Sequence, residues 1–171
     1  MLTFCLNLIL LRFLQPGVLS DAVMFLDPLS AFILSISRDP FRLALVRYSH
    51  DQKIVNLSFV PGIVGMILAT GIAGWYHHSA SFQPLFVMLG ATVVELFAEP
   101  FYVYLTLSLK IPTRAKCEGM AYLIRCVVFF STVYGMYSYQ FGDEWFLYAF
   151  SGSYLVYAGV LYLLYTRVSP R

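Results

Sequence analysis

Two glutamates, Glu95 and Glu99, interrupt an otherwise apolar run from Leu85 to Leu109, LFVMLGATVVELFAEPFYVYLTLSL. Their spacing of four residues places both carboxylates on one face of a helix. A carboxylate at bilayer depth costs several kcal/mol unless it is paired, protonated or facing a wet cavity. We therefore expect this face to point away from lipid, into the interior of a membrane protein that handles a solute or an ion.

Polar residues recur at helical spacing on three of the apolar segments, so each of these segments has one polar stripe. The stripes consist of Ser35, Arg38 and Arg42; of Thr92, Glu95, Glu99, Tyr102 and Thr106; and of Glu118, Tyr122, Arg125 and Thr132. Pro40 follows Asp39 in the first stripe, and Pro100 follows Glu99 in the second. A proline inside a helix removes a backbone hydrogen bond and bends the helix, so we expect a kink at Pro100.

Arginines and carboxylates inside a membrane suit two different roles. The planar fork of arginine matches phosphate, and carboxylates beside it accept hydrogen bonds from sugar hydroxyls or hold the arginines in place. Stripes on three helices favour a polar cavity that admits a hydrophilic or anionic group. The alternative is structural, with Glu95 or Glu99 paired to Arg125 or Arg38 to hold the helices together.

The other residue types that carry chemistry form no recognisable site. Cys5, Cys117 and Cys126 make no CxxC pair, and the adjacent His77 and His78 point to different faces of a helix. The sequence has no glycine-rich phosphate loop, no Ser/His/Asp arrangement and no basic run for nucleic acid. We therefore expect no metal site, no cofactor, no nucleic-acid partner and no enzymatic activity.

The composition is that of an integral membrane protein. Of the 171 residues, 60% are hydrophobic, 18% aromatic and only 12% charged, whereas soluble domains have about 25% charged residues. The mean hydropathy is +0.74. The sequence predicts an all-α, polytopic transmembrane helix bundle embedded in the lipid bilayer. The expected helices form a single transmembrane lobe, residues 1–171, and cover about 2–14, 28–48, 54–76, 84–109, 115–137 and 144–166.

The first of these helices is too short for a span, which takes about 20 residues, and Met1 opens directly into its apolar run. The run also lacks the basic start and the small-residue cleavage site of a signal peptide. We therefore expect it to be the second half of a truncated helix.

Basic residues gather in alternate loops of this six-helix topology. They are Arg42, Arg47 and Lys53; Lys110, Arg114 and Lys116; and Arg167 and Arg171. The intervening loops contain no lysine or arginine, and tryptophans and tyrosines cluster at the helix ends beside them. The positive-inside rule predicts that the basic loops are cytosolic, and we interpret the aromatic residues as interfacial anchors.

Four segments, in order along nearly the whole chain, resemble the Rft-type oligosaccharide translocation proteins of the endoplasmic reticulum. LTFCLNLILLRFL and FILSISRDPFRLAL resemble the first two helices of that family, VVELFAEPFYV its E-L-x-x-E-P-F-x-V segment, and KCEGMAYLIRC its E-x-x-x-x-x-x-K/R-C segment. The matching residues are Ser37, Arg38, Asp39, Phe41, Arg42, Glu95, Glu99, Pro100, Glu118 and Arg125. Pro40 departs from the family pattern, which more often has a small residue there.

The resemblance implies membership of the flippase superfamily that includes the multidrug-and-toxin extruders, with two six-helix lobes around a central cavity. This chain would be the N-terminal lobe, and its partner would be the missing C-terminal lobe or a second chain. The implied activity is movement of dolichyl-pyrophosphate-linked heptasaccharide from the cytosolic to the lumenal leaflet of the endoplasmic reticulum membrane, for N-glycosylation of proteins.

Residue roles follow from the same resemblance. Arg38, Arg42 and Arg125 would meet the pyrophosphate, and Glu95 and Glu99 would face the sugars or balance the arginines. The remaining matches would support these five: Ser37, Asp39, Phe41, Pro100 and Glu118. Two alternatives stay open at this stage. One is a scaffold of the N-glycosylation machinery that transports nothing, and the other is a cation-coupled extruder of small molecules with an ion site at Glu95 or Glu99.

Overall fold

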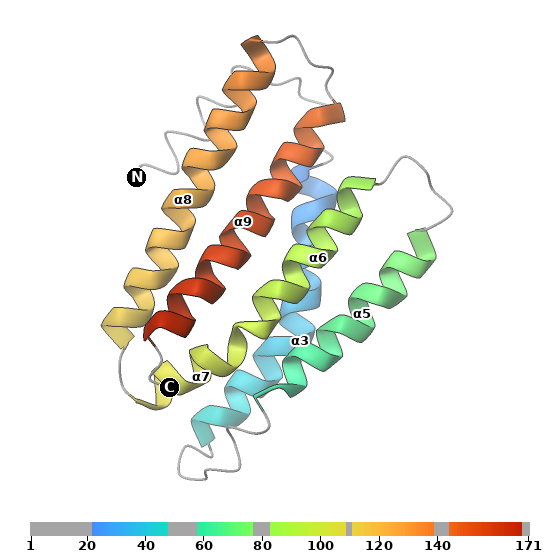
Figure 1. Ribbon diagram of the computed structural model, residues 1–171. Coiled ribbons are helices and arrows are strands. Elements are labelled where there is room, and N and C mark those ends of the chain that lie inside the picture. Colours follow the sequence, from blue (N-terminus) through green and yellow to red (C-terminus); the bar gives the residue numbers. More distant parts are fainter. Residues whose placement is uncertain (1–21, 48–57, 77–82, 109–110, 139–143, 169–171) are drawn as a thin grey trace.

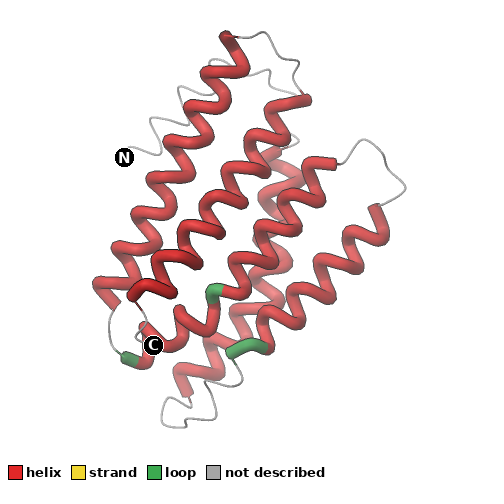
Figure 2. The backbone as a smooth tube through the Cα atoms, viewed as in Figure 1, coloured by secondary structure: helices red, strands yellow, loops and turns green. Residues whose placement is uncertain are grey.

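The computed structural model describes residues 22–47, 58–76, 83–108, 111–138 and 144–168, which are almost entirely helical (Figure 2). In chain order the elements are η1 Ala22–Leu26, α3 Asp27–Arg47, α5 Val60–Tyr76, α6 Gln83–Phe97, α7 Glu99–Leu107, α8 Ile111–Ser138 and α9 Glu144–Val168. None of the described residues is in a strand. The prediction of an all-α helix bundle is confirmed, whereas the helix expected over 2–14 lies outside the described residues.

The helices α8, α9, α6 and α5 lie side by side in one layer, and α3 lies behind α6 and α5 (Figure 1). Within this layer α9 packs mainly against α6 and α8, and α5 packs against both α6 and α3. The pairs α5–α6 and α8–α9 are antiparallel (Figure 1). One end of the bundle gathers the C-terminal ends of α3, α7 and α9 and the N-terminal end of α8 (Figure 1).

Three helical stretches are long and apolar enough to cross a bilayer, by length and composition: Gln83–Leu107, Ile111–Ser138 and Trp145–Val168. The apolar helix α5 has 17 described residues, fewer than the about 20 that a span takes. Helix α3 has 21 residues, but it includes Asp27, Arg38, Asp39, Arg42 and Arg47. The six-span topology therefore stays a prediction for α3, for α5 and for the segment 2–14.

The helix expected over 84–109 is divided into α6 and α7 at Ala98. The Ala98 amide donates to the Glu95 carbonyl at 3.0 Å, three residues back instead of the usual four. Pro100 has no amide hydrogen, so it makes no hydrogen bond to the Leu96 carbonyl. The kink that Pro100 predicts is thus present as a break two residues before it, with Glu95 on one side and Glu99 on the other.

Close packing of α3, α5 and α6 depends on one glycine. Gly65 is buried on α5, and a Cβ atom there would collide with the Leu96 side chain and lie 3.3 Å from the Ser37 hydroxyl oxygen. That hydroxyl donates a hydrogen bond to the Ile33 carbonyl within α3. Small residues allow membrane helices to approach closely. Gly65 therefore lets α5 pack closely against both Leu96 of α6 and Ser37 of α3.

This packing predicts different outcomes for two glycines of α5. Gly65→Leu should destabilise the bundle by about 1–3 kcal/mol, because the added side chain overfills the space beside Leu96. Gly71→Leu is the matched control, since a Cβ atom at Gly71 meets nothing within 4 Å. The measurement is the fraction of protein that survives heating in detergent, followed by size-exclusion chromatography. Equal survival of the two variants would contradict the close approach at Gly65.

Candidate functional site

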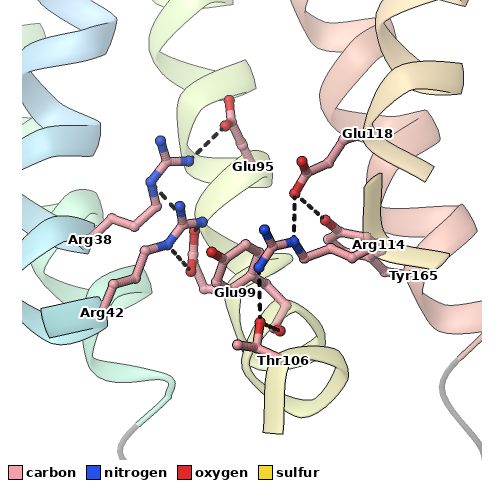
Figure 3. Close-up of polar contacts among 9 residues, drawn as sticks. Arg38, Arg42, Glu95, Glu99, Thr106, Arg114, Glu118 and Tyr165 are labelled. Carbon is pink, nitrogen blue, oxygen red and sulfur yellow. Dashed lines mark hydrogen bonds and ion pairs between the residues drawn. The ribbon is translucent and has the colours of Figure 1, made fainter. Parts of the chain in front are cut away.

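The candidate site is built on α3 and on the break between α6 and α7. Arg38 and Arg42 lie one turn apart on α3 and point toward Glu95 and Glu99 (Figure 3). Glu95 belongs to the last turn of α6, and Glu99 is the first residue of α7. The break at Ala98 therefore lies between the two carboxylates that face α3.

The four side chains form a connected ionic network. Arg42 holds Glu99 with two contacts, Nη2 to Oε1 at 2.6 Å and Nε to Oε2 at 3.3 Å. Arg38 donates from Nη1 to Glu95 Oε1 at 3.1 Å, and its Nε lies 3.6 Å from Glu99 Oε1. Arg38 thus bridges the two carboxylates. Charge-assisted pairs of this kind are stronger than neutral hydrogen bonds.

The carboxylates are much more buried than the arginines that hold them. Glu95 and Glu99 are only 6% and 3% exposed, whereas the side chains of Arg38 and Arg42 are 24% and 28% exposed. Each buried negative charge is therefore compensated, as the cost of burying an unpaired charge demands. Of the two arginines considered as structural partners, Arg38 is in an ion pair and Arg125 is in none within the described part of the chain.

Two buried atoms of this network have no hydrogen-bond partner among the described residues: Arg38 Nε and Glu95 Oε2. Nearly all buried polar atoms in proteins are hydrogen-bonded, so such atoms call for an explanation. One is a donor of an arginine and the other an acceptor of a carboxylate, and both residues line the same cavity. This cavity therefore offers unused donor and acceptor capacity to a polar ligand or to water.

A second polar cluster adjoins the first through Tyr102 of α7. The Tyr102 ring is in contact with two guanidinium groups, with Arg42 at 3.7 Å and Arg114 at 4.6 Å from its centroid. Arg114 also donates to Thr106 Oγ1 at 3.2 Å. Its Nε lies 3.6 Å from Glu118 Oε1, which accepts a hydrogen bond from Tyr165 at 2.9 Å (Figure 3). The ends of α3, α7, α8 and α9 are thus connected through polar side chains.

Arg125 of α8 is held by aromatic rings and not by a carboxylate. Its guanidinium lies 4.1 Å from the centroid of the Tyr154 ring and 5.6 Å from that of Phe150. A cation over an aromatic face is stabilised by the ring quadrupole without being neutralised. Within the described residues Arg125 therefore keeps an uncompensated positive charge for an anion.

One cavity of about 1140 Å³ connects these groups, and Arg38, Arg42, Arg125, Glu95, Glu99 and Glu118 all line it. Asp27 and Asp39 line it as well, so its carboxylates outnumber its arginines. An anion would therefore bind where positive charge is locally in excess, which is at Arg125. Among the described residues no group of three or more His, Cys, Asp and Glu side chains is placed to hold a metal ion.

Three residues of the expected site lie off this cavity. Ser37 faces α5 beside Gly65, and Phe41 is not among the lining residues. Pro100 lines a separate pocket of about 680 Å³, together with Phe97, Phe101, Tyr104 and Tyr162. These residues are part of the same sequence motifs as Arg38 and Glu99, but they point to other faces of their helices.

Sequence reasoning missed the contribution of α9 and the role of Arg114. Arg114 was expected in a loop, whereas α8 already begins at Ile111 and includes it. On α9 the lining residues are Phe146, Phe150, Tyr154, Tyr157, Leu161 and Tyr165. Their spacing of three and four residues is a helical face. This pattern was available in the sequence but is hidden by the many other aromatic residues of α9.

Comparison with known proteins supplies the family. The family model described as Rft protein matches residues 1–169. Relatives from Saccharomyces cerevisiae, Eremothecium gossypii and Xenopus tropicalis are 26%, 29% and 26% identical over 80%, 78% and 99% of this chain. Each relative is named Man(5)GlcNAc(2)-PP-dolichol translocation protein RFT1.

The matches cover 29%, 28% and 33% of the length of these three relatives, so the chain spans a third of their length or less. No solved structure matches the chain. The family match covers almost every residue and includes α3, α6 and α7, the three helices of the ionic network. This chain belongs to the Rft protein family.

Proposed function

We propose that this lobe takes part in moving dolichyl-pyrophosphate-linked oligosaccharide, at the heptasaccharide stage, from the cytosolic to the lumenal leaflet of the endoplasmic reticulum membrane. The observation that carries the proposal is a cavity of about 1140 Å³ in a membrane helix bundle, lined by arginines, carboxylates and aromatic rings. The names of the relatives support the substrate class. The movement needs no covalent chemistry, so the lobe acts as a translocation protein and not as an enzyme.

The proposed substrate-binding residues are Arg38, Arg42, Glu95, Glu99 and Arg125. Arg125 suits the pyrophosphate best, because its charge is uncompensated among the described residues and its position is set by Tyr154. Arg38 can reach a phosphate oxygen, because its side chain is 24% exposed and its Nε donates no hydrogen bond among the described residues. Glu95 can accept a sugar hydroxyl through its unpaired Oε2. Arg42 and Glu99 hold each other and keep the other two residues in place.

The proposed working unit contains a second lobe, either a C-terminal lobe or a second chain. The cavity is lined from α3, α6, α7, α8 and α9, with Ala98 between α6 and α7. In transporters with two lobes, substrate binds between them and alternating access follows from rocking of one lobe against the other. We propose that the unit is a multi-pass protein of the endoplasmic reticulum membrane, as the family resemblance implies, and that its basic loops are cytosolic, as the positive-inside rule predicts.

The cation-coupled alternative is supported by one observation, the buried Glu95 oxygen without a hydrogen-bond partner among the described residues. A carboxylate oxygen of this kind can bind a proton or a sodium ion. Transport by the full-length protein that follows an ion gradient, and that is lost in Glu95→Gln, would favour this alternative. Glycolipid movement at the same rate with and without an ion gradient would exclude the cation-coupled alternative.

Arg125→Ala in the full-length protein should cause dolichol-linked heptasaccharide to accumulate and secretory proteins to be underglycosylated, because the lobe loses its uncompensated cation. Arg125→Lys should retain part of the function, since it keeps the charge but loses the planar fork. The measurement is a profile of lipid-linked oligosaccharides in cells that depend on the variant. Arg167→Ala is the control, because Arg167 is exposed at the end of α9. A normal profile for Arg125→Ala at normal protein level would contradict the assignment.

Exchanging the two residues of the Arg42–Glu99 ion pair distinguishes its contribution to stability from its contribution to substrate binding. Arg42→Ala should destabilise the lobe by about 3–5 kcal/mol, because Glu99 is then buried without its two-pronged partner. The exchange Arg42→Glu with Glu99→Arg restores a pair and should recover the protein level. We expect the oligosaccharide profile to remain abnormal, because the charges have moved across the cavity. Full recovery of the profile would mean that this pair is structural only.

A further inference from the structure

The cavity has two walls of different chemistry. The charged wall comes from α3, α6 and α7 and includes Asp27, Arg38, Asp39, Arg42, Glu95 and Glu99, and α8 adds Glu118 and Arg125 beside the aromatic residues. The aromatic wall comes from α8 and α9 and consists of Tyr122, Phe129, Phe146, Phe150, Tyr154, Tyr157 and Tyr165. A simple inorganic ion would gain little binding energy from aromatic faces, and a hydrocarbon chain would gain none from charged groups. The combination suits a ligand that carries charged groups next to rings with polar substituents.

The chemistry of the aromatic wall changes along α9. The first two of its residues on this helix, Phe146 and Phe150, are purely apolar, and the following three are tyrosines. Tyr154 and Tyr157 lie in the middle of α9, and Tyr165 lies near its end. The Tyr165 hydroxyl donates to Glu118, which is also in an ionic contact with Arg114 (Figure 3). Along α9 the wall therefore changes from apolar rings to rings with hydroxyl groups.

Three tyrosines of this wall form a compact group, and Arg125 lies against one of them. The rings of Tyr122 and Tyr157 have centroids 4.8 Å apart, and Tyr154 meets Tyr157 edge to face at 5.9 Å. Arg125 lies over the Tyr154 ring at 4.1 Å. Tyr122 is 46% exposed, so part of its ring remains open. The group thus combines fixed rings, one accessible ring and one uncompensated cation.

The hydroxyl groups of Tyr122, Tyr154 and Tyr157 have no hydrogen-bond partner within the described part of the chain, in contrast to that of Tyr165, which donates to Glu118. Tyr122 is itself exposed, and the hydroxyl oxygens of Tyr154 and Tyr157 are not among the fully buried atoms that lack a partner in the described residues. The three hydroxyl groups on one wall of the cavity are therefore available to a ligand with many hydroxyl groups of its own.

We propose that Tyr122, Tyr154 and Tyr157 form a glycan platform, on which a sugar ring of the glycolipid headgroup stacks while the tyrosine hydroxyls bind its hydroxyl groups. The negative face of an aromatic ring attracts the weakly positive C–H groups of a sugar ring. Arg125, beside Tyr154, then binds the phosphate that is attached to the sugar. This inference rests on the proposed function, and it assigns the sugar to α8 and α9 instead of to the glutamates alone.

The test compares two ligands on the purified full-length protein in detergent. One is a short-chain polyprenyl pyrophosphate that carries two N-acetylglucosamine residues, and the other is the same lipid without sugar. Tyr122→Leu should weaken binding of the glycosylated ligand about fivefold to tenfold and leave the bare pyrophosphate unchanged. Tyr157→Phe keeps the ring and its packing, and it should weaken the glycosylated ligand about fivefold through the lost hydroxyl. Tyr134→Leu is the control, because Tyr134 is exposed on α8 and is not a lining residue.

Each other outcome overturns a specific statement. Equal weakening of both ligands by Tyr122→Leu and Tyr157→Phe would mean that the tyrosines support the cavity and do not bind sugar. Unchanged binding in both variants would remove the platform. If the unmodified protein binds both ligands equally well, the platform is wrong and the proposed function stands. If it binds neither, the proposed function fails and the platform with it.

Discussion

The structure depends on the cost of placing two carboxylates inside a bundle that has lipid around it. Glu95 and Glu99 are almost fully buried, and they are tolerated because Arg38 and Arg42 reach them from α3. This requirement places α3 against the break between α6 and α7. Gly65 lets α5 pack closely against both α3 and α6, and the spacing of four residues places both carboxylates on the face toward α3.

The same network leaves a cavity with an uneven distribution of charge. On one side the arginines are neutralised by carboxylates, and on the other Arg125 is held by aromatic rings and stays positive. An anion is therefore directed to α8, whereas polar groups without charge can bind near Arg38 and Glu95, each of which has one atom without a hydrogen bond in the described part of the chain. Such a division suits a large headgroup that contains both phosphate and sugar.

Several features could be predicted because their causes are local in the chain. Burying charge in an apolar run is costly wherever the helix packs, so the stripes containing Arg38, Glu95 and Arg125 were recognisable from spacing. The effect of Pro100 is a backbone effect and appears at Ala98. Membership of a motif was a weaker guide, since Ser37, Phe41 and Pro100 belong to the matching segments but lie off the cavity.

The sequence alone determined the helical class, the membrane environment, the family and the helix faces that carry charge, because these depend on composition and on periodicity along one segment. The tertiary structure decided the partners. Glu99 is held mainly by Arg42, and Arg125 lies over the Tyr154 ring without a carboxylate partner in the described residues. Helix α9 supplies an aromatic wall to the cavity. These choices depend on how far apart helices lie and on how they are rotated. Packing at positions such as Gly65 sets those distances, and no periodicity within a single helix encodes them.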